Sequence, residues 1–64
     1  MKYNLVGQNG NAFSLMAYTA SAMKKEKFPR EEISKMQEEA MSGDYNNLLV
    51  VLDNYIAKCN QEDE

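Results

Sequence analysis

The amino-acid sequence predicts an all-α domain, a small three-helix bundle that follows a short extended arm. Apolar residues recur at helical spacing in three segments, and breaks rich in glycine, proline and aspartate separate these segments. The chain has 64 residues, which is enough for one domain of modest stability. We divide it into an extended arm (2–6), a turn (7–10), three helices (about 11–27, 30–41 and 45–59) and an acidic tail (60–64).

The alternation of polar and apolar residues from Lys2 to Val6 predicts a short β-strand. The pair Asn9-Gly10 then indicates a turn, because both residues tolerate positive φ angles. The residues that follow have helical spacing, so the hairpin that such a turn often joins is not expected. The strand is left without a partner in its own chain. Since an unpaired strand edge invites pairing with another chain, we expect a homodimer formed through the arm.

The first helix is expected to begin at Asn11, whose side chain can cap the first turn. Its apolar and small residues cover most of the circumference, which is typical of a buried helix. We therefore expect the first helix to be the element around which the others pack. Phe28-Pro29 ends it, because the residue before a proline avoids the α region.

Pro29 suits the first turn of the second helix, where its missing N–H is not needed. At the next break, Gly43 can end that helix in a left-handed conformation and Asp44 can cap the third. The third helix has the clearest pattern, since its apolar residues fall within an arc of about 120° and predict one buried face. These residues are Tyr45, Leu48, Leu49, Leu52, Tyr55, Ile56 and Cys59.

Composition limits the function classes. Ten acidic and seven basic residues give a net charge of −3, which argues against nucleic acid as the main partner. There is no histidine, and Cys59 is the single cysteine. We therefore expect no enzyme, no catalytic residue, no cofactor, no metal site and no small-molecule substrate. The absence of a signal-like start and of a run of about 18 apolar residues predicts a cytoplasmic protein without membrane contact.

The outward side of the third helix is a candidate partner surface. A solvated helix face is normally rich in Lys and Glu, but this one carries amides, a valine and an alanine. Depletion of charge is typical of the centre of an interface. An ordinary, unoptimised solvent face is the alternative, and the sequence favours it slightly. The residues of this predicted surface are Asn46, Asn47, Val50, Asn54 and Ala57.

Two further features raise the question of anion binding. The turn from Gly7 to Asn11 leads into a helix N-terminus, but it lacks the spacing and lysine of a P-loop, so a turn with an N-cap is favoured. Glu26, Glu31 and Glu32 are interleaved with a basic patch and largely cancel its charge, which favours a solvated helix end. The patch consists of Lys24, Lys25, Lys27 and Arg30.

Two stretches of this sequence, LVGQNGNAF and EAMSGDYNNLL, resemble a family of small proteins of bacteria and their phages. Members of that family carry LVGQDGNAF near the start and SGDYxxLL in the second half. The similarity covers roughly Asn4 to Ile56, with Asn9 in place of a commoner Asp and Pro29 in place of a commoner capping Ser. The resemblance implies a compact helical fold and a phage or prophage origin. It implies no catalytic residue.

We therefore expect a non-enzymatic protein-interaction module, such as a phage accessory protein that binds a protein partner. The alternative is a small nucleic-acid-binding protein that resembles a helix-turn-helix in its second and third helices or uses the basic patch. The third helix would then offer Asp44, Asn46, Asn47 and Asp53 to DNA with one basic residue, Lys58. Phosphate anchoring by that helix would be poor.

Overall fold

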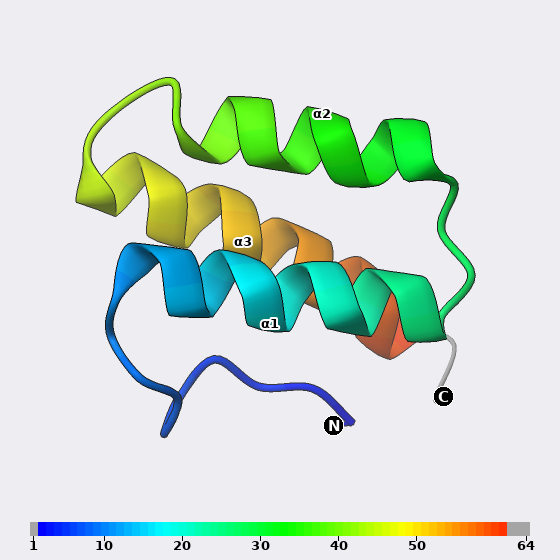
Figure 1. Cartoon of the computed structure of the whole chain (residues 1–64). Helices are drawn as coiled ribbons and strands as arrows, with labels where there is room; N and C mark the ends of the chain where they lie inside the picture. The colour runs from blue at the N-terminus through cyan, green and yellow to red at the C-terminus, as the bar shows by residue number, and fades with distance from the viewer. Residues whose placement is uncertain (1, 62–64) are drawn as a thin grey trace.

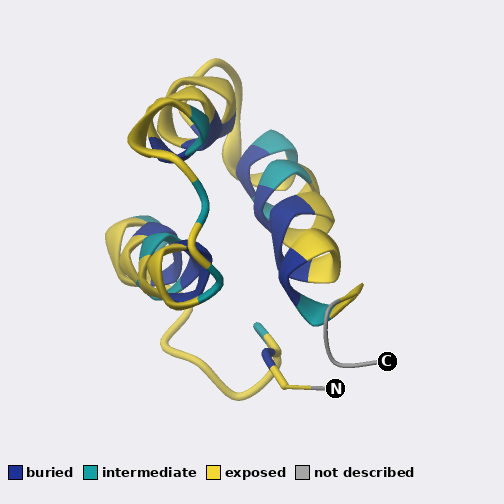
Figure 2. Ribbon diagram, turned by 90° about the vertical axis from the view of Figure 1, so that its right-hand side faces the viewer, coloured by how far each residue is buried: buried dark blue, intermediate teal, exposed yellow. Residues whose placement is uncertain are grey.

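The computed structural model describes residues 2–61 and contains three helices within them, α1 (Ala12–Lys25), α2 (Arg30–Ala40) and α3 (Tyr45–Gln61). No strand occurs in this range, so the all-α prediction is confirmed. α1 and α2 run along the same side of the molecule, and α3 starts next to α2 and passes behind α1 (Figure 1). Viewed from the side, the buried residues of all three helices face a common interior (Figure 2).

The central helix is α3, not α1. α3 packs against both α1 and α2, which contact each other much less. Along α1, Phe13, Ala17 and Ser21 form an exposed face. The expectation that the other segments pack around α1 is therefore wrong. Alanine is common in helices because of its backbone propensity, so a helix rich in alanine can read as apolar all round without being buried all round.

The core face of α3 is largely as predicted. Leu48, Leu52, Tyr55, Ile56 and Cys59 are buried. The two remaining members of the predicted face lie at its edges, where Leu49 is half-buried and Tyr45 is exposed. The other helices and the arm complete the core with Tyr3, Leu15, Met16, Ala22, Met23, Ile33, Met36 and Ala40.

The predicted N-caps are confirmed. The Asn11 side chain accepts hydrogen bonds from the backbone N–H groups of Phe13 (2.9 Å) and Ser14 (3.3 Å). The Asp44 carboxylate accepts from the backbone N–H of Asn47 at 2.9 Å. Both side chains satisfy donors that a helix start leaves without an intrahelical partner.

The prediction that Gly43 ends α2 in a left-handed conformation is wrong, because Gly7 is the one described glycine with a positive φ. The end of α2 is instead closed by side chains. The Ser42 hydroxyl and the Asn47 amide both donate to the backbone carbonyl of Glu39, at 2.7 and 2.9 Å. Gly43 is needed for space, since a Cβ there would lie 2.9 Å from the Cβ of Asn47.

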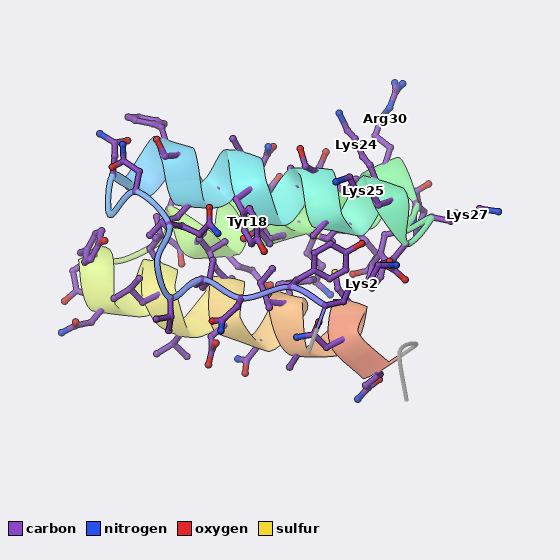
Figure 3. The ribbon with its side chains drawn as sticks, turned by 90° about the horizontal axis from the view of Figure 1, so that it is seen from below. Lys2, Tyr18, Lys24, Lys25, Lys27 and Arg30 are labelled. Atoms are coloured by element: carbon purple, nitrogen blue, oxygen red, sulfur yellow. The ribbon has the colours of Figure 1, made fainter. Side chains whose placement is uncertain are left out.

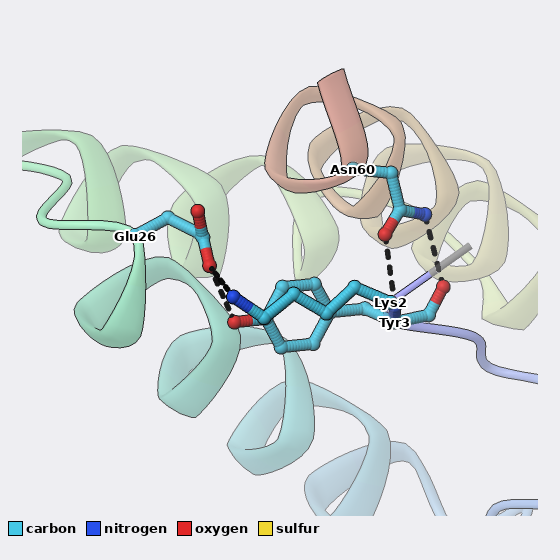
Figure 4. A network of polar contacts seen from close by, with 4 residues as sticks. All are labelled: Lys2, Tyr3, Glu26 and Asn60. Carbon is cyan, nitrogen blue, oxygen red and sulfur yellow. Dashed lines mark hydrogen bonds and ion pairs between the residues drawn. The ribbon is translucent and has the colours of Figure 1, made fainter. Parts of the chain in front are cut away.

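The β-strand predicted from Lys2 to Val6 is not formed, because the chain already turns at Leu5, whose carbonyl accepts from the N–H of Gln8 at 3.1 Å. The amide of Asn60 accepts from the backbone N–H of Tyr3 at 2.8 Å and donates to its carbonyl at 2.9 Å (Figure 4). The next N–H, that of Asn4, donates to the Tyr18 hydroxyl at 2.9 Å. The expectation that the arm has no partner in its own chain is therefore wrong, because side chains satisfy its backbone as a neighbouring strand would.

Asn60 is able to hold the arm because α3 continues through Gln61. The sequence predicted that an acidic tail starts at residue 60. Residues 60 and 61 instead belong to α3. The rest of that tail, 62–64, lies outside the described residues.

Tyr3 and Lys2 fasten the arm to the end of α1 as well. The Tyr3 hydroxyl donates to Glu26 Oε2 at 2.6 Å, and the Lys2 ammonium lies 3.0 Å from the same oxygen (Figure 4). The hydrogen bond from Tyr3, followed by that from Lys2, lowers the pKa of Glu26 below its usual range. The same bond is the main cause that raises the pKa of Tyr3. The arm thus joins α1 to α3.

Candidate protein-interaction surface

Three large apolar side chains are exposed at the end of the molecule where α1 begins, α2 ends and α3 begins. The exposed fractions of Phe13, Met41 and Tyr45 are 69%, 61% and 46%. They surround a hollow of about 240 Å³, which we call the apolar hollow. Its lining is Ala12, Phe13, Met16, Ala40, Met41, Gly43, Asp44, Tyr45 and Leu48.

The walls of the apolar hollow are held by local hydrogen bonds. The cap at Asn11 holds the first turn of α1, which carries Phe13. The Tyr45 hydroxyl donates to the backbone carbonyl of Gly10, which ties the turn before α1 to the start of α3. On the opposite wall, the Asn47 amide donates to the backbone carbonyl of Glu39 and so holds the end of α2 to the start of α3. The hollow is therefore largely preformed, as binding sites usually are.

Segments that are far apart in the sequence meet at this place. Ala12 and Phe13 belong to LVGQNGNAF, whereas Gly43, Asp44 and Tyr45 belong to SGDYNNLL. Asp44 is the one charged residue in the lining, and its carboxylate caps α3. Apolar walls with a single carboxylate suit an apolar side chain from a partner rather than a charged ligand.

Sequence reasoning missed this surface because it assigned Phe13 and Tyr45 to the core. Both residues lie within the first two positions of their helices, and Met41 follows the last residue of α2. At a helix end the neighbouring elements diverge, so an apolar residue on the core side of the helical projection can remain uncovered. The sequence feature that could have predicted this surface is the presence of a large apolar residue at each of three helix ends.

Four of the five residues of the predicted partner surface follow one another along the outer face of α3, at spacings of three or four residues. Asn46, Val50, Asn54 and Ala57 are exposed, but Asn47 is half-buried and its amide binds the end of α2. Val50 lines a shallow hollow of about 270 Å³ with Leu5, Leu49 and Asp53. Asn47, Asn54 and Ala57 instead line a wider, polar groove of about 590 Å³ between α2 and α3.

Groups in the groove between α2 and α3 are bound to one another. The Tyr55 hydroxyl donates to Glu39 Oε1 at 3.0 Å. Burial, together with the bond to Glu39, raises the pKa of Tyr55 to about 12. The Lys58 ammonium lies 4.6 Å from the centre of the Tyr55 ring, at cation–π distance. A tyrosine that keeps its proton to such high pH is a poor general base.

The basic patch lies at the opposite end of α1 from the apolar hollow. All four side chains are exposed and extend away from the ribbon where α1 passes into α2 (Figure 3). Within residues 2–61, none of Lys24, Lys25, Lys27 and Arg30 forms an ion pair. Glu26 is bound by Lys2 and Tyr3, so the cancellation of charge expected from the sequence is only partial.

The turn from Gly7 to Asn11 is occupied by its own side chains. Asn9 Oδ1 accepts from the N–H of Asn11 at 3.0 Å, and Asn11 caps the donors that follow. These N–H groups are the ones that an anion at the start of α1 would use. The geometry is that of a turn with an N-cap.

The remaining chemistry of the described residues is sparse. Cys59 is fully buried, and burial raises the pKa of its thiol, so it is a poor nucleophile. No group of three or more Cys, Asp or Glu side chains within residues 2–61 is placed to hold a metal ion. In the same range, no helix combines the length and apolar character needed to cross a membrane.

Comparisons with known proteins give no relative. No family model matches the chain, and neither the curated proteins nor the solved structures contain a significant match. The functional argument therefore rests on the surfaces described above.

Proposed function

We propose that this chain is a non-enzymatic protein-interaction module whose contact surface is the apolar hollow with its rim of Phe13, Met41 and Tyr45. The observation that carries this proposal is the gathering of these three exposed side chains around one hollow. Single exposed apolar residues are normal, whereas a contiguous apolar patch marks an interaction site. The ligand is an apolar side chain of a protein, since the lining contains one charged group.

The state of the titratable groups supports a non-enzymatic role. Tyr3 and Glu26 hold the arm, and Tyr55 is bound to Glu39. Cys59 is buried, and burial together with the negative charge of Glu26 raises the pKa of its thiol. A nucleophile with a base within hydrogen-bond reach, the usual minimum for covalent catalysis, is not among the described contacts.

The resemblance of the two sequence stretches supports a more specific role, that of a phage-encoded accessory protein that binds a host protein in the cytoplasm. An unpaired Cys59 is compatible with that reducing compartment. An accessory protein of this kind needs a compact scaffold and one contact surface, and both are provided by 64 residues.

Capture of a partner with matched variants tests the proposal. Phe13→Glu places an acid in the first turn of α1, where the helix dipole favours it, so the variant should fold while the apolar rim is lost. Ser21→Glu, about 12 Å further along the same exposed face, is the control. The wild-type chain and Ser21→Glu should retain the same host protein from native-cell lysate, and Phe13→Glu should lose it. Equal capture by all three would remove the apolar hollow as the contact surface.

The predicted α3 surface is tested in the same experiment. Val50→Glu combined with Asn54→Lys adds charge at positions four residues apart, a spacing that supports a helix slightly. If this variant loses the partner and Phe13→Glu keeps it, the outer face of α3 is the contact surface instead.

Binding of nucleic acid through the basic patch is the second candidate function. It is favoured by the absence of ion pairs to these four side chains within residues 2–61 and by their position at one end of the molecule. Lys58, by contrast, is stacked on Tyr55, so α3 is the weaker choice for contacting phosphates. Four phosphate contacts would give a slope of about −4 for log K against log salt with duplex DNA. A flat dependence, or no binding at low salt, would exclude this function.

A further inference from the structure

Asn9 and Gly10 form the one asparagine–glycine pair of the chain, and both residues are exposed. The backbone nitrogen of the residue after an asparagine can attack the side-chain amide, and glycine hinders this attack least because it has no Cβ. Asn9 is therefore the asparagine whose side-chain amide is most open to attack. The other six asparagines are each followed by a residue with a side chain, and they are Asn4, Asn11, Asn46, Asn47, Asn54 and Asn60.

The fold itself does not require glycine at position 10. Neither Asn9 nor Gly10 has a left-handed backbone, since the positive φ angles of the described residues are at Gly7 and Lys27. A Cβ on Gly10 would lie 3.7 Å from the Tyr45 hydroxyl oxygen, which is an ordinary contact. The missing side chain thus serves neither the conformation nor the packing of the turn, but it leaves the Gly10 nitrogen unhindered.

The hydrogen bonds of the turn favour attack by this nitrogen. Asn9 Oδ1 accepts from the N–H of Asn11 at 3.0 Å, and this bond turns the Asn9 side chain toward the peptide that follows it. The same N–H stabilises the negative charge that develops on Oδ1 when the amide carbon is attacked. Within residues 2–61, the N–H of Gly10 donates to no oxygen, so its proton is open to base from the solvent.

We propose that Asn9 is a site of spontaneous deamidation, which converts it to aspartate and isoaspartate. Solvent base removes the Gly10 N–H proton, and the nitrogen forms a bond to Asn9 Cγ. The bond from Cγ to the side-chain nitrogen breaks, and that nitrogen takes up a proton and leaves as ammonia. One water then opens the cyclic imide. Cleavage between the Gly10 nitrogen and Cγ gives aspartate, and cleavage between that nitrogen and the main-chain carbonyl carbon gives isoaspartate.

The two products act differently on the start of α1. Aspartate keeps an acceptor for the Asn11 N–H and adds negative charge before a helix whose first turn holds no acidic residue. Isoaspartate inserts its Cβ into the backbone and so displaces Gly10, whose carbonyl accepts from the Tyr45 hydroxyl. The modification therefore lies beside a wall of the apolar hollow, but its occurrence does not depend on what the hollow binds.

Peptide mapping by mass spectrometry of the full chain, aged in its folded state in neutral buffer, tests this inference. The peptide that contains Asn9 should gain the mass difference between an amide and an acid, while the other asparagines stay intact. The conversion should be faster at higher pH, because base removes the Gly10 proton. Gly10→Ala, which the packing tolerates, should slow the conversion severalfold. Circular dichroism establishes that this variant folds.

Ageing of the same chain in urea separates the fold from the dipeptide alone. The folded chain should convert at least as fast as the unfolded one, because the bond from Asn11 exists only in the fold. Of the separated products, the isoaspartate form should unfold at a lower temperature than the aspartate form. An Asn9 that stays intact in the folded chain while it converts in urea would overturn the proposal. Conversion spread evenly over the asparagines, or a Gly10→Ala variant that converts at the wild-type rate, would do the same.

Discussion

Lys27 is the one non-glycine residue in the described range with a left-handed backbone, with a φ of 64°. It follows the last turn of α1, where its N–H donates to the carbonyl of Lys24 and the N–H of Phe28 donates to that of Met23. This is the pattern of a helix end that usually places glycine at the left-handed position. Sequence patterns do not indicate this helix end, because lysine is not the residue that usually marks it.

Replacing Lys27 with glycine should therefore stabilise the fold. A side chain in the left-handed region costs roughly 1–2 kcal/mol, and the greater freedom of glycine in the unfolded chain offsets part of that gain. We expect Lys27→Gly to raise the free energy of unfolding by about 1 kcal/mol in urea denaturation. Lys27→Ala removes the same charge but keeps the Cβ. An equal gain in the alanine variant would mean that charge, not backbone conformation, is responsible.

Leu52 lies at the centre of the buried face of α3, and Leu49 lies at its edge. Leu52 is fully buried, so Leu52→Ala should cost roughly 2–5 kcal/mol, a large part of the stability of a small domain. Leu49 is half-buried, and Leu49→Ala should cost less than half as much. Denaturant unfolding of both variants measures the difference. Equal losses would show that the buried face is centred nearer Leu49.

At the scale of elements, helical periodicity predicted the three helices well and their packing less well. The apolar arc of α3 and the caps at Asn11 and Asp44 depend on local sequence, and the structure has them as expected. The central helix is the one that packs against both of the others. The sequence of one helix alone does not show how many neighbours it will contact. The high alanine content of α1 therefore misled the prediction.

The contacts of the arm could not be predicted from local sequence either. The alternation between Lys2 and Val6 predicted a strand that the structure does not contain, and the partners of the arm, Tyr18, Glu26 and Asn60, lie far away in the sequence. Side-chain amides and hydroxyls that bind a distant backbone leave no periodic pattern. The dimer expected through the arm depended on the absence of such partners.

The bonds of the arm to Glu26 predict a pH dependence. The folded state lowers the pKa of Glu26 from 4.5, with the hydrogen bond from Tyr3 as the main cause. Its contribution to stability is thus complete above about pH 4.5 and is lost as the pH falls through the lower folded pKa, since the unfolded chain takes up the proton first. Glu26→Gln should flatten this acid limb in thermal unfolding from about pH 5 to pH 2.

A second variant separates the hydrogen bond from the charge. Tyr3→Phe removes the main cause of the shift, so the loss of stability should again begin near pH 4.5 but should end at a higher pH than in the wild type and be smaller in total. A Glu26→Gln profile identical to that of the wild type would show that this cluster does not couple the arm to folding.

The whole molecule has two chemically different ends. The basic patch is at the junction of α1 and α2, and the apolar hollow is at the opposite end of α1. The sequence revealed the basic patch directly, because its members are close along the chain. The apolar hollow is built from three helix ends that are distant in sequence, so it becomes visible only in the folded chain.

Site-specific photo-cross-linking in native cells tests the central claim most directly. A photoreactive phenylalanine analogue at position 13 projects from the rim of the apolar hollow, and the same analogue at position 21 reports on ordinary exposed surface of α1. We predict a single discrete covalent adduct with a host protein from position 13, and none from position 21. No product from position 13, or equal products from both positions, would contradict the assignment of the apolar hollow as the interaction surface.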